Sequence, residues 1–347
     1  MSRQSLAVKY RPRTFEDVCG QNITVKILQK SVEQRNFKHC YLFAGDSGCG
    51  KTTLARIFGY AINGGLGTLE EMDAASRNGV DDVRALVEAG KQRALDSEYK
   101  IFIVDECHAI TTQGWQAFLK GIEEPSPYTI FIFCTTEPNK IPETIMNRMQ
   151  RYNITKIEPK TVYQRLCQIC QAEGFTNYEA ACDIISKTSH GCMRDAIMKL
   201  DQCADYSTDL CMENVKLVLN TVSYEAMFNL IWALQDKDIA RVLGIFDTLG
   251  NSGVDLKSFI ELLLELNLDL TKYLIFRDLN CTNIPLYLNS EQNPIVNYTV
   301  TRAITTPAEC VAWFNALTDI LLQIKLDIKY DTNYKSTIGA YLIRFCK

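Results

Sequence analysis

The feature that most constrains this chain is a glycine-rich stretch, "AGDSGCGKTTLARI", at residues 44–57. It has the spacing G-x-x-x-x-G-K-[ST] and lies between a short apolar run and an amphipathic helical pattern. In that setting, glycines let backbone N–H groups surround a phosphate, and the N-terminus of the following helix adds a favourable dipole. The stretch therefore predicts a nucleotide-binding loop between a strand and a helix.

The side chains of this loop indicate how a nucleotide is held. Lys51 can neutralise charge on the β- and γ-phosphates, and the Thr52 hydroxyl can ligate Mg²⁺. We expect the nucleotide site to include every residue of the loop, namely Gly45, Asp46, Ser47, Gly48, Cys49, Gly50, Lys51, Thr52 and Thr53.

Three apolar runs are typical of buried parallel strands, and helical patterns separate them. The runs are "HCYLFAG" (39–45), "KIFIVDE" (100–106) and "YTIFIFCTTE" (128–137). They predict an α/β domain with a parallel sheet between helices. Such a sheet places its ligands at the carboxyl ends of the strands.

Polar residues end the second and third of these strands. Asp105 can hold Mg²⁺ directly or through water, and Glu106 can polarise the attacking water as a general base. Thr136 is a candidate for contact with the γ-phosphate or with that water. The plainer interpretation is an acidic strand end that faces solvent, with Thr136 an ordinary strand residue. Since a loop that only binds a nucleotide does not need Glu106, its presence favours hydrolysis of ATP.

The strand signal disappears after about Pro159, and helical patterns fill the rest of the chain. We expect an α/β ATPase domain at 1–159, a small helical lid domain at 160–222 and an all-α collar domain at 223–347. The collar would serve oligomerisation, because its aromatic and Leu-rich helices leave apolar surface for partner helices.

Composition narrows the class of protein further. A net charge of −4 argues against a chain coated in basic charge for nonspecific nucleic-acid binding, but a local basic groove stays open. The start "MSRQSLAVKYRPRTFEDV" has no signal-peptide core, and charged residues interrupt the most apolar run, so no membrane span is expected. We interpret most of the 14 cysteines as reduced, buried apolar residues of an intracellular protein, the pair Cys167 and Cys170 included.

Several motifs together resemble those of AAA+ ATPases of the clamp-loader branch, and among these the bacterial DNA polymerase III gamma/tau type most closely. They follow the family's order and spacing over most of the first 205 residues. The motifs are "VKYRPRTFEDVCGQ", "GDSGCGKTT", "EMDAASRNGVDDVRAL", "YKIFIVDECHAITTQGWQAFLKGIEEP", "FCTTEPNKIPETIMNRM" and "GCMRDAIMKLDQC".

This resemblance implies roles for further residues. Arg148 matches the arginine that reaches into the ATP site of a neighbouring subunit, and Arg194 matches the lid arginine that touches the γ-phosphate of its own subunit. Without the resemblance, both arginines fit better as surface ion-pair partners. The resemblance also implies that four residues pack against adenine: Tyr10, Arg11, Pro12 and Val18.

The chain departs from the family pattern in three respects. The interval between Cys49 and Cys107 contains no cysteine, whereas the family usually carries a four-cysteine zinc module there, so no zinc is expected. The arginine motif reads Asn147–Arg148–Met149 and lacks its usual Ser and Cys. The sequence also resembles a short form without the tau-type tail, which suggests a phage or another mobile element as its source.

The resemblance implies an ATP- and Mg²⁺-dependent subunit of a clamp loader, which opens a sliding clamp and loads it onto primer–template DNA. The expected partners are other clamp-loader subunits in a pentameric assembly, the clamp and DNA. The expected place is the cytoplasm, at the replication fork of a cell or of a phage-infected host. Two alternatives stay open: another AAA+ DNA motor of the branch-migration type, and a nonhydrolysing scaffold subunit of a replication complex.

Overall fold

The structure, a computed structural model, describes residues 4–219, 224–251, 255–278, 307–329, 331 and 333–346. The chain forms two compact units, Met1–Asn214 and Val215–Lys347, which are described separately below. The expected boundary between lid and collar, at 222/223, lies outside the described residues. The division into three domains stays a prediction.

A five-stranded sheet forms the centre of the first unit, with the strand order β2-β3-β4-β1-β5. Each strand pairs with its neighbours in parallel, as the sequence predicts for an α/β domain. The strands are β1 (Cys40–Gly45), β2 (Leu69–Asp73), β3 (Lys100–Asp105), β4 (Thr129–Thr135) and β5 (Gln150–Ile154).

The three predicted strands are the central ones, and the two that the sequence did not suggest lie at the edges. The sequences of β2 and β5 are "LEEMD" and "QRYNI", in which most side chains are exposed or half-buried. An edge strand with polar side chains produces no continuous apolar run. Periodicity therefore identifies only strands that helices cover on both faces.

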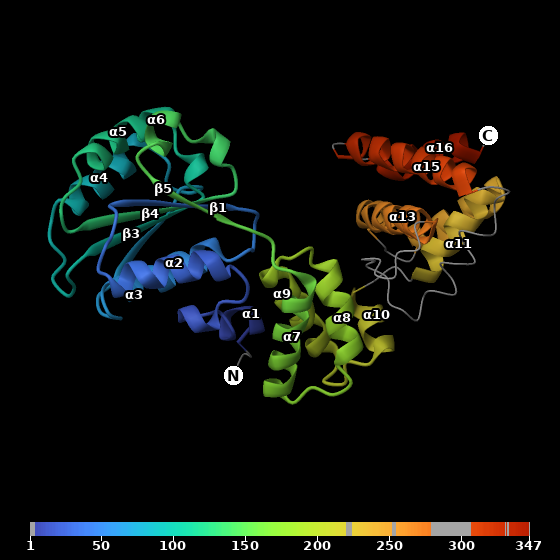
Figure 1. The fold of residues 1–347 in the computed structure, drawn as a ribbon, viewed down its shortest axis with the longest axis horizontal. Coiled ribbons are helices and arrows are strands. Elements are labelled where there is room, and N and C mark those ends of the chain that lie inside the picture. The colour runs from blue at the N-terminus through green and yellow to red at the C-terminus, as the bar shows by residue number, and fades with distance from the viewer. Residues whose placement is uncertain are drawn as a thin grey trace. The chain divides into compact units, whose positions relative to one another are not determined.

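Helices cover both faces of this sheet (Figure 1). Because the faces are covered, the carboxyl ends of the strands are the places where a ligand can bind. One face carries α4 (Val80–Gly90), α5 (Thr112–Glu123) and α6 (Glu143–Met146), and the other carries α2 (Asn22–Glu33) and α3 (Lys51–Ile62).

Side chains alternate between the two faces along each central strand. On β4, Phe131 and Phe133 pack against Phe118 of α5, with ring centroids 5.8 and 5.3 Å apart. Ile132 lies between them in sequence and belongs to the opposite core, which contains Phe58 of α3. This two-sided burial holds the carboxyl ends of β1, β3 and β4 in fixed positions.

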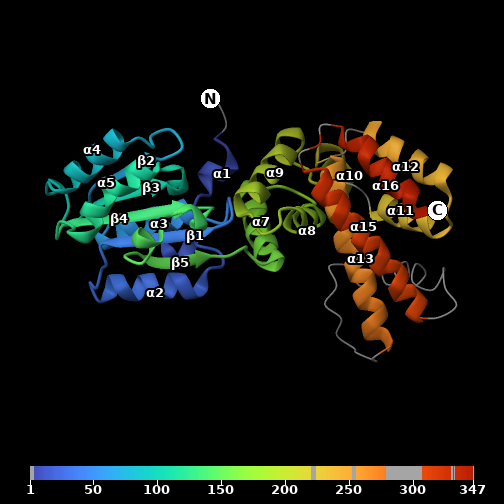
Figure 2. The ribbon, with the colours of Figure 1, turned by 90° about the horizontal axis from the view of Figure 1, so that it is seen from above.

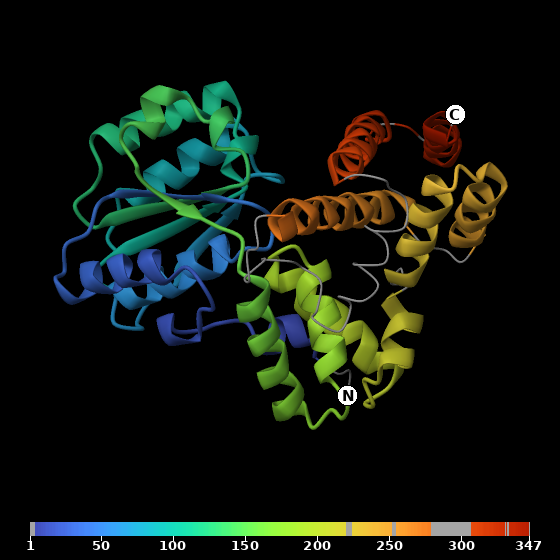
Figure 3. The same ribbon diagram turned by 45° about the vertical axis from the view of Figure 1, so that its right-hand side comes forward.

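After the sheet, α7, α8 and α9 pack on one another (Figure 3). The N-terminal helix α1 joins them, because Ser5 Oγ donates a hydrogen bond to Asp201 Oδ2 of α9 at 2.8 Å. Segments that are almost 200 residues apart in the chain thereby meet beside the phosphate loop. The bounds are α1 (Leu6–Lys9), α7 (Pro159–Glu173), α8 (Glu179–Thr188), α9 (Met193–Tyr206) and α10 (Met212–Leu219).

The described elements of the second unit are all helices, and α13 and α15 run along each other (Figure 2). Its helices are α11 (Tyr224–Gln235), α12 (Ile239–Asn251), α13 (Leu256–Asp278), α15 (Pro307–Asp327) and α16 (Tyr334–Cys346). Asn267 is fully buried between α13 and α15, where its amide donates to Phe314 O and Thr318 Oγ1, each at 2.8 Å. None of the helices in the described part of the chain is both long and apolar enough to cross a bilayer.

Candidate nucleotide-binding site

The glycine-rich loop adopts a backbone that side chains would disfavour. Gly50, which precedes α3, has φ +101°, and Gly48 has φ +71°. A Cβ on residue 48 would also lie 2.0 Å from Sγ of Cys192, at the start of α9. Glycine at this position therefore satisfies both the left-handed backbone and the close approach of the α9 segment.

Lys51 is buried at the first turn of α3, with 6% of its surface exposed. Its Nζ donates to the carbonyls of Gly45 at 3.0 Å and Asp46 at 2.9 Å. The ammonium is thus held inside the curve of the loop, where it could contact the oxygens of a bound phosphate.

The two predicted Mg²⁺ ligands lie in direct contact. Thr52 Oγ1, on α3, donates to Asp105 Oδ2, at the end of β3, at 2.7 Å. The other carboxylate oxygen of Asp105 accepts from the Glu106 backbone N–H at 3.0 Å. A hydroxyl and a carboxylate are hard oxygen donors of the kind that Mg²⁺ prefers, and these residues fit that ion. No group of three or more His, Cys, Asp or Glu side chains able to hold a metal occurs in the described residues, and the expected absence of zinc stays a prediction.

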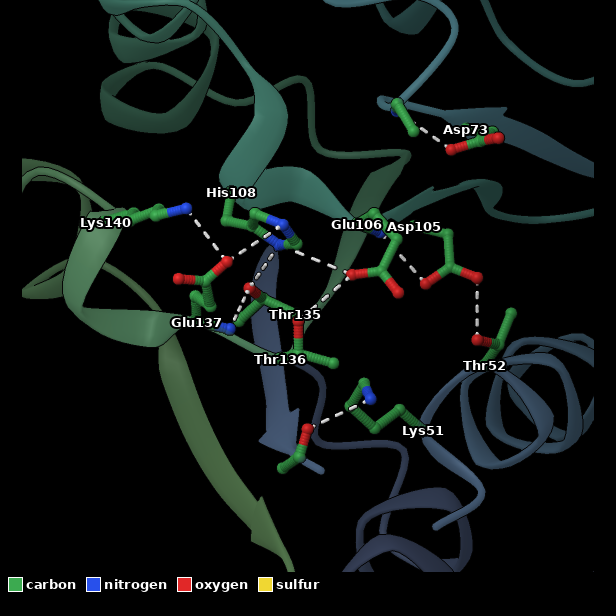
Figure 4. Close-up of polar contacts among 12 residues, drawn as sticks. Lys51, Thr52, Asp73, Asp105, Glu106, His108, Thr135, Thr136, Glu137 and Lys140 are labelled. Atoms are coloured by element: carbon green, nitrogen blue, oxygen red, sulfur yellow. Dashed lines mark hydrogen bonds and ion pairs between the residues drawn. The ribbon is translucent and has the colours of Figure 1, made fainter. Parts of the chain in front are cut away.

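Glu106 has an unusual backbone directly after β3. Its φ is +46°, in the left-handed region that costs a residue with a side chain about 1 kcal/mol or more. Its Oε2 lies 3.4 Å from Oγ1 of Thr136, which follows β4. Two predicted catalytic residues from different strands therefore meet at the carboxyl edge of the sheet (Figure 4).

His108 joins this cluster, and the sequence analysis did not single it out. It lies in a short 3-10 turn, η2 (Cys107–Ala109), and its Nδ1 is 3.1 Å from Thr135 Oγ1 and 3.3 Å from Glu106 Oε2. Its Nε2 lies 3.5 Å from Glu137 Oε1. Its position two residues after a candidate general base was the one signal in the sequence that could have identified it.

A pocket of about 360 Å³ adjoins the loop, large enough for a nucleoside. It brings together the four residues expected to contact adenine with the loop and with Arg194 of α9. Cys19, Ile157, Arg165 and Met198 also line it, and none of these was among the predicted nucleotide contacts. The predicted residues around it are Tyr10, Arg11, Pro12, Val18, Gly48, Cys49, Gly50, Thr53 and Arg194.

Three arginines, Arg11, Arg165 and Arg194, line this pocket. Burial lowers the pKa of Arg11, and the nearby guanidinium groups of Arg56 and Arg194 lower it further. Arg11 Nε donates to Thr53 Oγ1 at 3.2 Å, which ties this cation to the phosphate loop. Arg56 is itself paired with Glu71, so the arginines that line the pocket are the cations that an anionic ligand would meet there.

Tyr10 is held by a residue of α7. Its hydroxyl donates a short hydrogen bond to Glu173 Oε1 of α7. Burial and this hydrogen bond raise the pKa of Tyr10 to about 12. The ring therefore stays neutral and fixed at the wall of the pocket.

Arg148 lies apart from the phosphate loop of its own chain. Its Nη2 pairs with Glu123 Oε1 of α5 at 2.7 Å, and both side chains are more than 40% exposed. Its Nη1 donates to the Thr144 carbonyl. Among the predicted site residues, Arg148 is thus the one placed outside the cluster at the sheet edge and the pocket beside it.

Known proteins resemble this chain over most of its length. The family described as "DNA polymerase III, delta subunit" matches residues 66–158. The DNA polymerase III subunit tau of Bacillus subtilis is 36% identical over 283 residues, covering 75% of this chain and 50% of the relative. The gamma/tau subunit of Mycoplasma genitalium is 33% identical over 295 residues, covering 78% of this chain and 49% of the relative.

This chain is a AAA+ protein of the clamp-loader type. The resemblance to gamma/tau subunits that the motifs suggest is thereby confirmed. The chain spans about half the length of the curated relatives it matches.

Solved structures support the fold. RuvB of Thermotoga maritima, a Holliday junction branch migration motor, superposes with a TM-score of 0.52 at 17% identity. The match covers 71% of this chain and 86% of the RuvB chain. At this identity, the likeness confirms the AAA+ architecture and carries no conclusion about activity.

Proposed function

We propose that this clamp-loader-type protein binds and hydrolyses ATP, and that hydrolysis drives the loading of a sliding clamp onto primer–template DNA. The observation that carries the proposal is the meeting of Lys51, Thr52, Asp105 and Glu106 at one edge of the sheet. The contacts of Thr52 with Asp105 at 2.7 Å and of Lys51 with the loop carbonyls support it.

The residues divide the chemistry between them. Lys51 and Arg194 would bind the phosphates. Thr52 and Asp105 would hold Mg²⁺, which when bound would supply positive charge beside the phosphates. Glu106 accepts a proton from the attacking water, and Thr136 orients that water or the γ-phosphate. The expected adenine contacts at the pocket wall (Tyr10, Arg11, Pro12 and Val18) fix the position of the base and thereby of the phosphates.

Assembly would complete the site. The Arg148 guanidinium lies on the surface beside Glu123, where a neighbouring subunit could receive it in place of that ion pair. We propose that it stabilises the charge that develops on a neighbour's γ-phosphate. ATP would then order a ring or spiral of subunits, pentameric by the resemblance, that encloses DNA and holds the clamp open in the cytoplasm.

ATPase turnover of the purified protein, measured with and without primed DNA, candidate clamp and co-expressed partners, tests this proposal. We expect turnover that rises with DNA and clamp, and an assembled complex whose measured mass shows several subunits. A protein that binds ATP without turnover under all conditions would be a scaffold subunit. Turnover that responds to branched DNA and not to primed DNA would indicate a branch-migration motor.

A further inference from the structure

His108 occupies a position that the proposed chemistry does not yet use. Its side chain is 18% exposed and lies between the ends of β3 and β4. One ring nitrogen faces Glu106 and Thr135, and the other faces Glu137 (Figure 4). The imidazole thus touches the candidate general base on one side and the segment after β4 on the other.

Thr135 fixes the orientation of this ring. Its Oγ1 already accepts the Glu137 backbone N–H at 3.0 Å, and it lies 3.1 Å from His108 Nδ1. A hydrogen on Nδ1 is favoured at this place, because a lone pair there would face the Glu106 carboxylate oxygen at 3.3 Å. On the far side, Glu137 is held in turn by Lys140 at 2.9 Å.

Glu106 needs such support. Its left-handed backbone is a costly conformation that persists only where the surroundings hold it. Its carboxylate is 38% exposed, and it contacts the side chains of His108 and Thr136. Without His108, the carboxylate would keep the 3.4 Å contact with Thr136 but could rotate more readily into solvent.

We propose that His108 is a positioning residue: it holds the Glu106 carboxylate toward the β4 tip, in the orientation that accepts the proton of the attacking water. It acts through Glu106, whose Oε2 lies 3.3 Å from His108 Nδ1. This inference rests on the proposed function, because it requires Glu106 to be the general base.

Three substitutions at one position test it. Asn can present an N–H near the place of Nδ1, Gln can present one near the place of Nε2, and Ala presents neither. We expect His108→Ala to lower kcat about 10- to 100-fold, since misplacing a reacting group by about 1 Å can cost that much. KM for ATP and the affinity for a fluorescent ATP analogue should change less than 2-fold. His108→Asn should recover most of the lost kcat, and His108→Gln should recover little.

Lys140→Ala is the matched control. It removes the ion pair between Lys140 and Glu137 and leaves the His108 side chain unchanged. We expect its kcat to stay near that of the unsubstituted protein. Thermal unfolding of all variants shows whether the domain stays folded. A His108→Ala protein with unchanged kcat, or kcat restored equally by Asn and Gln, overturns the positioning role. Equal losses in kcat and nucleotide affinity also overturn it, because they indicate a general structural role.

A Glu106→Gln variant, measured alongside the others, distinguishes a failure of this inference from a failure of the proposed function. Loss of turnover in Glu106→Gln together with normal turnover in His108→Ala rejects the inference about His108 alone. Full turnover in Glu106→Gln rejects the general-base assignment, and the role of His108 with it.

Discussion

At the scale of single residues, the site separates binding from chemistry. Lys51 is buried and fixed by two loop carbonyls, whereas Glu106 lies at the exposed edge with its oxygen near Thr136. The first residue can contribute to affinity as soon as phosphate enters. The second can act only when a water lies between it and the γ-phosphate.

Two substitutions should therefore separate ATP binding from turnover. Lys51→Ala removes the main cation near the β- and γ-phosphates and should abolish ATP binding. Glu106→Gln keeps the size and hydrogen bonding of the side chain but cannot accept a proton, so binding should persist while kcat falls about 10²- to 10⁴-fold. Equilibrium binding of labelled ATP and steady-state turnover measure the two effects. Wild-type turnover by Glu106→Gln would contradict the assignment.

At the scale of elements, the phosphate loop and the start of α9 constrain each other. Gly48 leaves no room for a side chain beside Cys192, whose Sγ also accepts the Asp195 N–H at 3.4 Å as the cap of α9. A change in the loop should therefore displace the α9 segment that carries Arg194.

Gly48→Ala tests this coupling, and Gly174→Ala is its control. Both glycines have nearly the same positive φ, +71° and +73°, but a Cβ at Gly174 meets nothing within 4 Å. We expect Gly174→Ala to cost about 1 kcal/mol of unfolding free energy and to leave ATP affinity unchanged. Gly48→Ala should lower ATP affinity at least 10-fold, and adding Cys192→Ala should recover part of the loss. Equal effects of the two glycine substitutions on affinity would show that backbone strain alone matters.

At the scale of the whole molecule, the placement of Arg148 decides whether one chain can be a complete ATPase. Its guanidinium is engaged by Glu123 and Thr144 on a part of the surface away from its own loop. If Arg148 completes the ATP site of a neighbouring subunit, efficient hydrolysis requires adjacent subunits that are aligned so that the arginine reaches that site.

Arg148→Ala should leave ATP affinity nearly unchanged while lowering DNA-stimulated turnover, because arginines supplied in trans contribute about 10³ to 10⁵ in rate in other enzymes. Mixing Arg148→Ala chains with Lys51→Ala chains should restore some activity where the assembly places them side by side, since each supplies what the other lacks. Native mass measurement confirms that mixed assemblies form. Normal turnover by Arg148→Ala alone, with no recovery on mixing, would make Arg148 an ordinary surface arginine.

The sequence by itself determined the phosphate loop, the three central strands and the positions of Lys51, Thr52, Asp105 and Glu106 along the chain. These depend on local patterns: a fixed glycine spacing, apolar runs buried on both faces and polar residues where a strand ends. The helices predicted after residue 160 have the same local origin. For the same reason, the resemblance to clamp-loader proteins could be read from short motifs.

Only the tertiary structure decided which residues meet. Strands β2 and β5 pair at the edges although their own sequences are polar, because the neighbouring strands supply the hydrogen bonds. His108, after β3, contacts Glu137, after the neighbouring strand β4, and Cys192 lies against Gly48 from more than 140 residues away in the chain. Such contacts leave no periodic trace in the sequence, since they depend on how the sheet and the helices α7 to α9 pack and not on the residues beside them in the chain.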